Sequence, residues 1–528
     1  MTAARRSCRR TGMRTAALAA AAGAVCLCRA LALAVPVDDD LARRTFANAD
    51  QLMREGKVEQ AMREFEQVSI SYAESGVADD ALYRMGQHYY PVEAADELGG
   101  ASQAALAKAK DLFARIASKY PREETAPRAL LKLGLIALDP VNPQRNLDEA
   151  YASFSGVLNI YPSSDVFDRA LFGAGYADFL AGRYDKSIAS FERVAEEHAG
   201  RPIAQDAHYY MGLAYVRQGS WIRALEELQA VRNLFPDGKL AGRALDLSTR
   251  VYKMKVLPGI SSSPLFGHDP SFAPAINPET IRGEISLAVD ADSVVHVLSP
   301  SEGTVQRMGS DGKLVSTGAP LPGAVSIAVD AQGVEVVAAG EAIRYGVKSV
   351  GPQRREDDSV TPLEEITAAA GLGLGRIAFV DGAANEVLLF SGDPANLKVL
   401  YRDPEGRARL SGLAVGAEER LYTIDRKGRR IIEINPDGRS RQIGGAPGGE
   451  PLFAEPAAVS ADDLGDLFVL DRRTHSVTIL TTEGKVLQTI TSQPGTSSEF
   501  ASPTTLSVGP RAEIYIHDEK RRTILRYR

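Results

Sequence analysis

The sequence predicts an α + β multidomain chain, with an N-terminal superhelix of helix pairs and a C-terminal six-bladed β-propeller. Two observations predict this architecture. A helical template recurs five times between about residues 38 and 237, and an aspartate recurs at intervals of 44, 46 and 47 residues near the C-terminus. Such periods are typical of stacked repeat units. A chain of 528 residues, 44% hydrophobic and 24% charged, is long enough for two such domains.

The first 34 residues differ from the rest of the chain. Arginines precede the apolar stretch TAALAAAAGAVCLC, and the small residues Ala32 and Ala34 follow it. This order is that of a secretory signal peptide, so we predict cleavage after Ala34 and export to the periplasm. Met13 is an alternative start to Met1, because the sequence from Met13 already has this form.

The same segment allows two alternatives to cleavage at Ala34. An uncleaved membrane anchor is disfavoured, because Arg29 interrupts an apolar run that is already short for a spanning helix. Lipid anchoring at Cys26 or Cys28 is disfavoured but stays open, since the bulky Val25 and Leu27 precede these cysteines.

The cysteines and the charge balance limit the chemistry of the mature chain. All three cysteines, Cys8, Cys26 and Cys28, lie in the predicted signal peptide, so we expect neither a disulfide nor a thiol nucleophile after cleavage. Loss of the six arginines before residue 35 leaves 55 basic against 68 acidic residues. An acidic export product is a poor candidate for binding nucleic acid.

The first half of the chain repeats one pair of helices. The second helix of each pair has a small residue, a large apolar residue four positions on and a β-branched residue three further, a spacing that places all three on one helix face. The preceding helix has a small residue where two helices must approach closely. These small residues are Ala49, Gly86, Gly134, Gly175 and Gly212.

This pattern resembles the tetratricopeptide repeat, which the sequence predicts over residues 38–255 as about five repeats and a capping helix. Endings such as KYP and LFP are similar to those of outer-membrane assembly and Tol-associated periplasmic proteins. The resemblance implies a concave groove that holds a protein or peptide partner. Repeat-defining residues such as Phe191 and Tyr215 are expected to be packing positions. The candidate partner-binding residues are those that vary between copies: Arg84, Gln87, Asp178, Arg217 and Gln218.

A proline-rich linker and a β-rich region follow. Residues 256–279 contain five prolines without helical periodicity, which indicates an interdomain linker. Beyond it, short apolar strands are separated by Gly, Asp and Asn. An aspartate ends the second strand of four of these units, and an Ile or Val follows six residues later. These aspartates, Asp381, Asp425, Asp471 and Asp518, are predicted to hydrogen-bond the turn that follows them.

Residues 280–528 resemble NHL-type propellers, with six blade starts spaced as four-stranded blades require. Asn385 occupies the turn of one blade only, and the second blade lacks the aspartate, so the resemblance concerns the propeller more than its subfamily. Because the chain ends in a third strand, we predict that residues 270–284 supply the closing strand of the last blade.

The sequence predicts no metal site, cofactor or catalytic group. His296, His475 and His517 do not occur at one level of the predicted blades, which makes a zinc site improbable. The SADDLGD turn at 460–466 has calcium-ligand residue types, but we interpret it as a solvated acidic turn. The GLGLGR segment at 371–376 lacks the following helix of a phosphate-binding loop.

We therefore expect a bacterial cell-envelope adaptor that binds proteins through the helical groove and through a face of the propeller. The alternative is a metal-dependent hydrolase or lyase on the propeller axis, with the repeats as a targeting arm, because some related propellers are such enzymes. A polysaccharide or peptidoglycan binder gains no specific support from a chain whose one tryptophan, Trp221, lies in a repeat helix.

Overall fold

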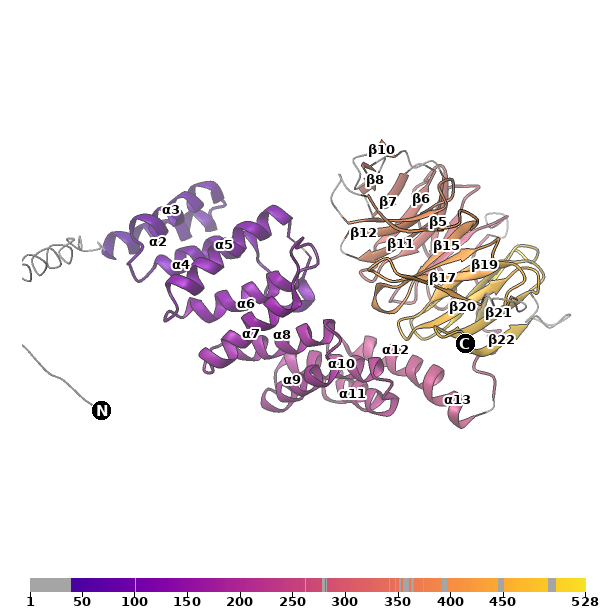
Figure 1. Ribbon diagram of the computed structural model, residues 1–528, viewed down its shortest axis with the longest axis horizontal. Helices are drawn as coiled ribbons and strands as arrows, with labels where there is room; N and C mark the ends of the chain where they lie inside the picture. The colour runs from indigo at the N-terminus through magenta and orange to yellow at the C-terminus, as the bar shows by residue number, and fades with distance from the viewer. Residues whose placement is uncertain are drawn as a thin grey trace, which may run out of the picture. The chain divides into compact units, whose positions relative to one another are not determined.

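The computed structural model describes most of the chain after the predicted signal peptide (Figure 1). The described residues are 39–99, 101–261, 263–277, 281, 283–340, 342–346, 348–350, 353–354, 360–361, 365–373, 375–391, 397–444, 451–491 and 500–528. The predictions about residues 1–34, including Cys26 and Cys28, lie outside them. No helix in these ranges is long and apolar enough to cross a membrane. Contacts divide the chain into two compact units, residues 1–167 and 168–528.

The first unit is built from antiparallel helix pairs. Its helices are α2 (Asp39–Arg54), α3 (Val58–Ser71), α4 (Ala78–Tyr89), α5 (Gln103–Lys119), α6 (Thr125–Leu138) and α7 (Leu147–Ile160). The two helices of a pair are as close as the repeated glycine predicts. A Cβ on Gly134 of α6 would lie only 2.5 Å from the ring of Phe154 on α7, so the contact leaves no room for a side chain. The insertion after α4 is packed, since the fully buried Lys132 donates to Glu93 at 2.6 Å.

The second unit begins with more helices of the same kind. These are α8 (Phe167–Leu180), α9 (Tyr184–Glu197), α10 (Pro202–Arg217), α11 (Trp221–Leu234) and α12 (Ala241–Val251), followed by the π-helical segment η2 (Tyr252–Val256) and the short α13 (Leu257–Ile260). Gly175 on α8 and Gly212 on α10 again face large side chains of the following helix, Phe191 and Leu228.

A six-bladed β-propeller completes the second unit. Its sheets are β1 to β4 (Ser286–Val289, Val295–Ser299, Thr304–Met308, Leu314–Thr317), β5 to β8 (Ala324–Val329, Glu335–Ala339, Ala342–Tyr345, Lys348–Val350), β11 to β14 (Ile366–Gly373, Arg376–Asp381, Glu386–Phe390, Leu397–Arg402), β15 to β18 (Leu410–Val415, Leu421–Asp425, Arg430–Ile434, Ser440–Ile443), β19 to β22 (Pro456–Ala461, Asp466–Asp471, Ser476–Thr481, Val486–Thr491) and β23 to β25 (Pro503–Val508, Ile514–Asp518, Thr523–Tyr527). Strands β9 (Gln353–Arg354) and β10 (Val360–Thr361) form a separate pair. The inner strands β1, β5, β11, β15, β19 and β23 contact one another in a closed ring.

The turn after each blade aspartate is stabilised by that residue. Asp381 accepts hydrogen bonds from the backbone N–H groups of Ala383 and Ala384, both at 3.0 Å. Four residues after the aspartates, the chain adopts a left-handed conformation, at Asn385, Arg429, His475 and Arg522, with φ between 46° and 53°. Asn is among the residues with a side chain that adopt this conformation most readily. This preference accounts for Asn385 in the turn of the third blade.

Much of the described part of the predicted linker 256–279 packs against the propeller. Helix α13 extends to Ile260, and Phe266, Phe272 and Ile276 are buried in the blade cores. The residues that pair with the last strand lie just before the predicted closing segment, 270–284. Residues 267–269 pair with β25, through reciprocal hydrogen bonds between Gly267 and Arg528 and a bridge from His268 to Tyr527. These residues lie earlier because Phe272 and Ile276 already belong to the core of the first blade.

Candidate functional site

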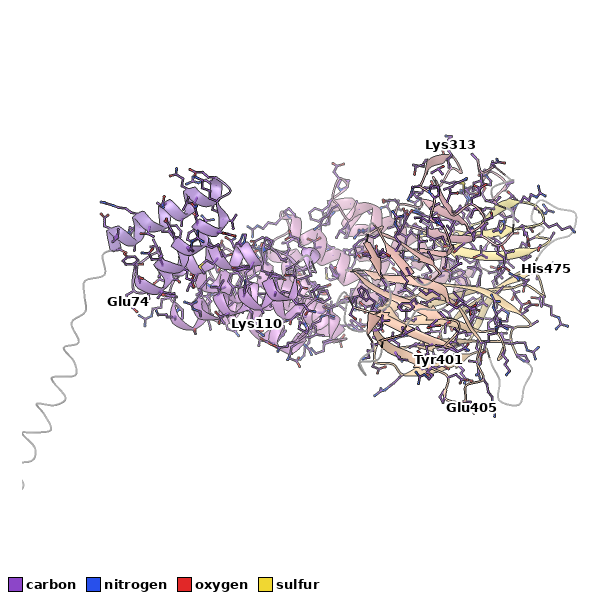
Figure 2. The ribbon with its side chains drawn as sticks, turned by 90° about the horizontal axis from the view of Figure 1, so that it is seen from above. Glu74, Lys110, Lys313, Tyr401, Glu405 and His475 are labelled. Carbon is purple, nitrogen blue, oxygen red and sulfur yellow. The ribbon has the colours of Figure 1, made fainter. Side chains whose placement is uncertain are left out.

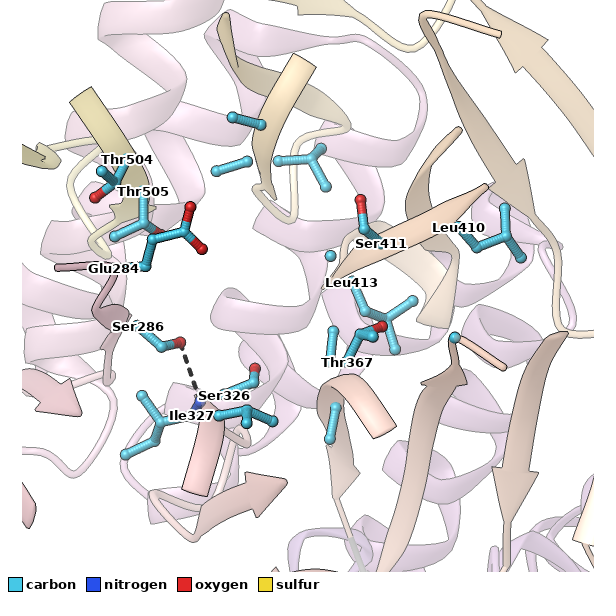
Figure 3. Close-up of a pocket in the computed structure, with 18 of the residues that line it drawn as sticks. Glu284, Ser286, Ser326, Ile327, Thr367, Leu410, Ser411, Leu413, Thr504 and Thr505 are labelled. Atoms are coloured by element: carbon cyan, nitrogen blue, oxygen red, sulfur yellow. Dashed lines mark hydrogen bonds between the residues drawn. The ribbon is translucent and has the colours of Figure 1, made fainter. Parts of the chain in front are cut away.

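The inner strands of the six blades enclose a cavity of about 450 Å³ around the propeller axis (Figure 3). Five inner strands carry a register shift where they line this cavity, at Val325, Thr367, Gly412, Ala457 and Thr504. An extra residue in a strand re-aims neighbouring side chains, so successive residues of one strand can both face the axis.

Small side chains and hydroxyl groups line the cavity. The hydroxyl-bearing residues are Ser286, Ser326, Thr367, Ser411, Thr504 and Thr505. Ser286 accepts a hydrogen bond from the N–H of Ile327 at 3.1 Å, which joins the inner strands of the first two blades (Figure 3). The hydroxyl of Thr367 is buried and has no partner among the described residues. The lining is therefore polar and able to both donate and accept hydrogen bonds.

Charged residues lie at one end of the cavity, the end at which the blade aspartates accept hydrogen bonds from the backbone of the turns. The cavity is bordered there by Arg409, Arg426, Arg472, Glu284 and Glu365. Arg426 donates to the hydroxyl of Ser411 at 2.8 Å, and Arg472 forms an ion pair with Glu284 at 2.7 Å. We call these five residues the charged mouth.

Arg409 is the arginine of the charged mouth whose side chain is exposed and has neither a hydrogen bond nor an ion pair with the described residues, whereas Arg426 and Arg472 each have a side-chain partner. Its position is set by Asp425, which accepts the N–H of Arg409 at 3.1 Å and the N–H of Gly428 in the turn at 3.0 Å. A structural aspartate thus places a free guanidinium at the cavity opening.

The propeller histidines lie apart from one another. His296 is buried between the first two blades, with Nδ1 2.7 Å from Glu335 and Nε2 3.0 Å from Asp290. His517 contacts the hydroxyl of Thr504 at 2.6 Å, and burial lowers its pKa to about 4. His475 occupies a turn at the edge of the propeller in the view of Figure 2. In the described ranges no group of three or more His, Cys, Asp or Glu side chains could hold a metal ion.

The predicted partner-binding residues contact other residues of the same chain. In the first unit, Arg84 lies 3.4 Å from Asp50, and Gln87 donates to Glu93 at 3.4 Å. In the second unit, Asp178 is buried and pairs with Arg183 at 2.5 Å.

The last two of these residues, Arg217 and Gln218, lie at the end of α10. Gln218 donates to Asp185 at 2.7 Å. Arg217 donates to the backbone oxygen of Asp463 in the propeller at 2.9 Å. The prediction that these residues bind a partner remains untested, although Arg217 already has a contact inside the second unit.

The acidic turn at 460–466 is where helices and propeller meet, which corrects its interpretation as a solvated turn. Arg250 of α12 contacts Asp463 at 2.7 Å, and Lys255 of η2 contacts Asp466 at 2.7 Å. Asp462 and Asp466 are buried. Burial, reinforced by the neighbouring charge of Asp466, raises the pKa of Asp462 to about 7. We call Asp462, Asp463, Asp466, Arg250 and Lys255 the junction cluster.

Comparisons with known proteins agree with the helical pattern. The tetratricopeptide repeat family model matches residues 169–200 and 206–238. No curated protein matches the sequence.

Several solved structures are similar to part of the chain. A streptogramin B lyase structure is 14% identical with a TM-score of 0.38, over 50% of this chain and 97% of that chain. A catalytically inactive virginiamycin B lyase from Staphylococcus aureus with quinupristin is 15% identical with a TM-score of 0.37, over 49% and 85%. A gluconolactonase from Xanthomonas campestris is 16% identical with a TM-score of 0.36, over 49% and 98%.

The protein is thus a tetratricopeptide-like helical array followed by a six-bladed β-propeller. Both architectures generally mediate protein–protein interactions, which supports an interaction scaffold as the class of protein.

Proposed function

We propose that the protein is an exported, non-enzymatic scaffold of the cell envelope, which binds one protein partner at the charged mouth and another through its helical repeats. The observation that carries this proposal is the junction cluster. Ion pairs at 2.7 Å join α12 and η2 to one turn of the propeller, so the last repeats and the propeller form one compact unit. A scaffold needs this property, because it must hold two partners at a fixed separation.

The composition of the charged mouth supports protein binding at the propeller. It combines three arginines with two glutamates around a cavity lined with hydroxyl groups. Arginine is enriched at protein interfaces because its planar guanidinium can form several hydrogen bonds at once. The exposed Arg409 is the residue that a carboxylate of the partner would pair with.

The test compares two exposed arginines of the same blade. The tagged chain 35–528 is used for affinity capture from envelope extract, beside Arg409→Glu and the control Arg439→Glu. Arg439 stands in a turn of the fourth blade, and its side chain is 86% exposed. We expect wild type and control to retain the same defined envelope protein, and Arg409→Glu to lose it.

Two results would contradict the proposal. Equal capture by all three proteins would remove the charged mouth from the interface. A purified chain that carries stoichiometric metal and turns over a small substrate would favour the hydrolase or lyase alternative instead.

A further inference from the structure

A second cavity, separate from the propeller axis, lies within the second unit where α11, η2 and α13 meet the last blade. Its volume is about 720 Å³. We call it the junction pocket. Lining residues come from α11 (Leu225), α12 (Leu245), η2 (Lys253), α13 (Leu257) and the turn between β23 and β24 (Arg511). The pocket shares no residue with the charged mouth.

One side of the junction pocket is apolar. Leu225, Leu245, Leu257 and Leu265 line it, each of them partly exposed, and Tyr252 beside them is 46% exposed. Binding of an apolar ligand to solvent-exposed apolar side chains in a concave surface is favourable, because it removes apolar surface of both from water. The leucines come from three helices and from the segment before β1, so together they line a groove and not a flat patch.

The other side of the junction pocket is basic. Its charged lining residues are Arg232, Lys253, Arg511 and Arg528, against a single acid, Glu513. Two of these cations are neutralised by residues outside the pocket, because Arg511 pairs with Asp246 at 2.5 Å and Arg528 with Asp269 at 3.0 Å.

Lys253 differs from the other cations in the pocket. Its ammonium lies 3.7 Å from the centre of the Phe266 ring and 3.4 Å from the backbone oxygen of Ala512. It forms no ion pair with any carboxylate of the described residues. Burial lowers the pKa of Lys253 to about 8. The charge of Glu513 opposes this shift without reaching ion-pair distance. An ammonium that is partly buried and has no carboxylate in contact can gain, from an anionic ligand, an interaction that replaces the hydration it has lost.

We propose that the junction pocket binds a long-chain aliphatic carboxylate, with its head group at Lys253 and its chain along Leu225, Leu245 and Leu257. Of the two lining cations without an ion pair among the described residues, Arg232 is exposed and Lys253 is partly buried, so Lys253 is the one that matches a carboxylate inside the pocket, and the leucines match an alkyl chain. A small anion such as acetate would leave the leucines uncovered. A cationic amphiphile would place like charges together.

Calorimetric titration of the chain 35–528 with dodecanoate, below its micellar concentration, tests the proposal. Acetate, inorganic phosphate and dodecyltrimethylammonium are titrated in parallel. We expect dodecanoate to bind at one site, with decanoate about fifteenfold weaker, because each buried methylene contributes about fourfold in affinity. The other three ligands should not bind. Binding of phosphate without dodecanoate, or equal binding of the cationic amphiphile, would overturn the proposal.

Substitutions locate the site. Lys253→Met, which keeps the apolar stem, should weaken dodecanoate binding at least tenfold, whereas Lys253→Arg should retain it. Leu225→Glu on the partly exposed face of α11 should also abolish binding, through a different element. Lys239→Met, at a lysine outside the pocket, is the matched control. Dodecanoate binding that survives both Lys253→Met and Leu225→Glu in folded variants would overturn the assignment.

Discussion

The guanidinium of Arg250 on α12 lies 2.7 Å from the carboxylate of Asp463, which stands 213 residues further along the chain in the turn between β19 and β20. The side chain of Arg250 is 11% exposed, and that of Asp463 is 50% exposed. This contact and the pair formed by Lys255 and Asp466 join the helices that follow the last repeat to a propeller blade, within one compact unit. The junction is therefore the place to test whether the protein behaves as a rigid scaffold.

A double-mutant cycle measures the contribution of this ion pair. Arg250→Ala, Asp463→Ala and the double variant should show a coupling of about 1 kcal/mol in the free energy of unfolding, because the arginine side of the pair is desolvated. The exposed pair Arg439 and Asp437, at 3.4 Å, is the control and should show less than about 0.5 kcal/mol. Chemical denaturation gives both values. Equal couplings would mean that the junction ion pair is only a surface contact.

The buried Asp462 should make the stability of the junction depend on pH. Its pKa is raised to about 7 by burial and by Asp466. Because the folded-state pKa exceeds the unfolded value, the ionised carboxylate opposes folding, and stability declines as pH rises from about 4 to about 7. Asn keeps the oxygen that accepts the N–H groups of Leu464 and Asp466, at 3.0 and 2.8 Å.

We therefore expect Asp462→Asn to raise the free energy of unfolding at pH 8 by about 2 kcal/mol. The gain should shrink toward zero as the pH falls toward 4. Denaturation curves at pH 5 and pH 8 measure it. A loss of stability at pH 8 would show that Arg250 and Lys255 stabilise the ionised form instead.

His296 should also make stability fall as the pH rises, but because its charged form stabilises the fold. Burial opposes its charge, but hydrogen bonds to Glu335 and Asp290 outweigh burial and raise the pKa of His296. The charged imidazole thus stabilises the fold below pH 6.5, and this contribution is lost as the pH rises through the raised value. His296→Gln should cost about 1 to 2 kcal/mol at pH 6 and less at pH 9.

Thermal unfolding at these two pH values checks the prediction for His296. His475→Gln, in a turn at the propeller edge, serves as the control for the loss of a histidine outside the buried cluster of His296. A cost for His296→Gln that does not change with pH would mean that the neutral imidazole already provides the stabilisation.

The repeats and the propeller could be predicted from the sequence because both arise from local periodicity. The glycines of the helix pairs and the four blade aspartates recur at fixed spacings, and the structure places them in the close approaches and turns that these spacings indicate. The tetratricopeptide resemblance and the six-bladed propeller are confirmed.

The contacts made between distant segments could not be predicted in this way. Asp463 has the residue type and the neighbours of a solvated acidic turn, and only the fold places Arg250 beside it. Arg217 likewise occupies a variable repeat position, yet it contacts the propeller. The register shifts in five inner strands place Thr367 and Gly412, among others, in the cavity lining, and alternation in the sequence does not show such shifts. Phe266 and Phe272 were interpreted as linker because prolines surround them, although they are buried in the blades.

The close approach of α8 and α9 allows a test of the helical packing with a matched pair of glycines. A Cβ on Gly175 would lie 2.9 Å from the ring of Phe191 and 3.0 Å from the Cβ of Ser190, whereas a Cβ on Gly242 in α12 would meet no atom within 4 Å. Alanine favours a helix over glycine by about 1 kcal/mol at either position. At Gly175, overpacking of about 1 to 3 kcal/mol opposes this gain, because the Phe191 ring is fully buried and cannot move aside.

We therefore expect Gly175→Ala to lower the free energy of unfolding and Gly242→Ala to raise it by about 0.5 kcal/mol. Chemical denaturation of the two variants measures the difference. If Gly175→Ala were as stabilising as Gly242→Ala, the helix pair would have room for a methyl group, and the repeated glycine would owe its place to something other than packing.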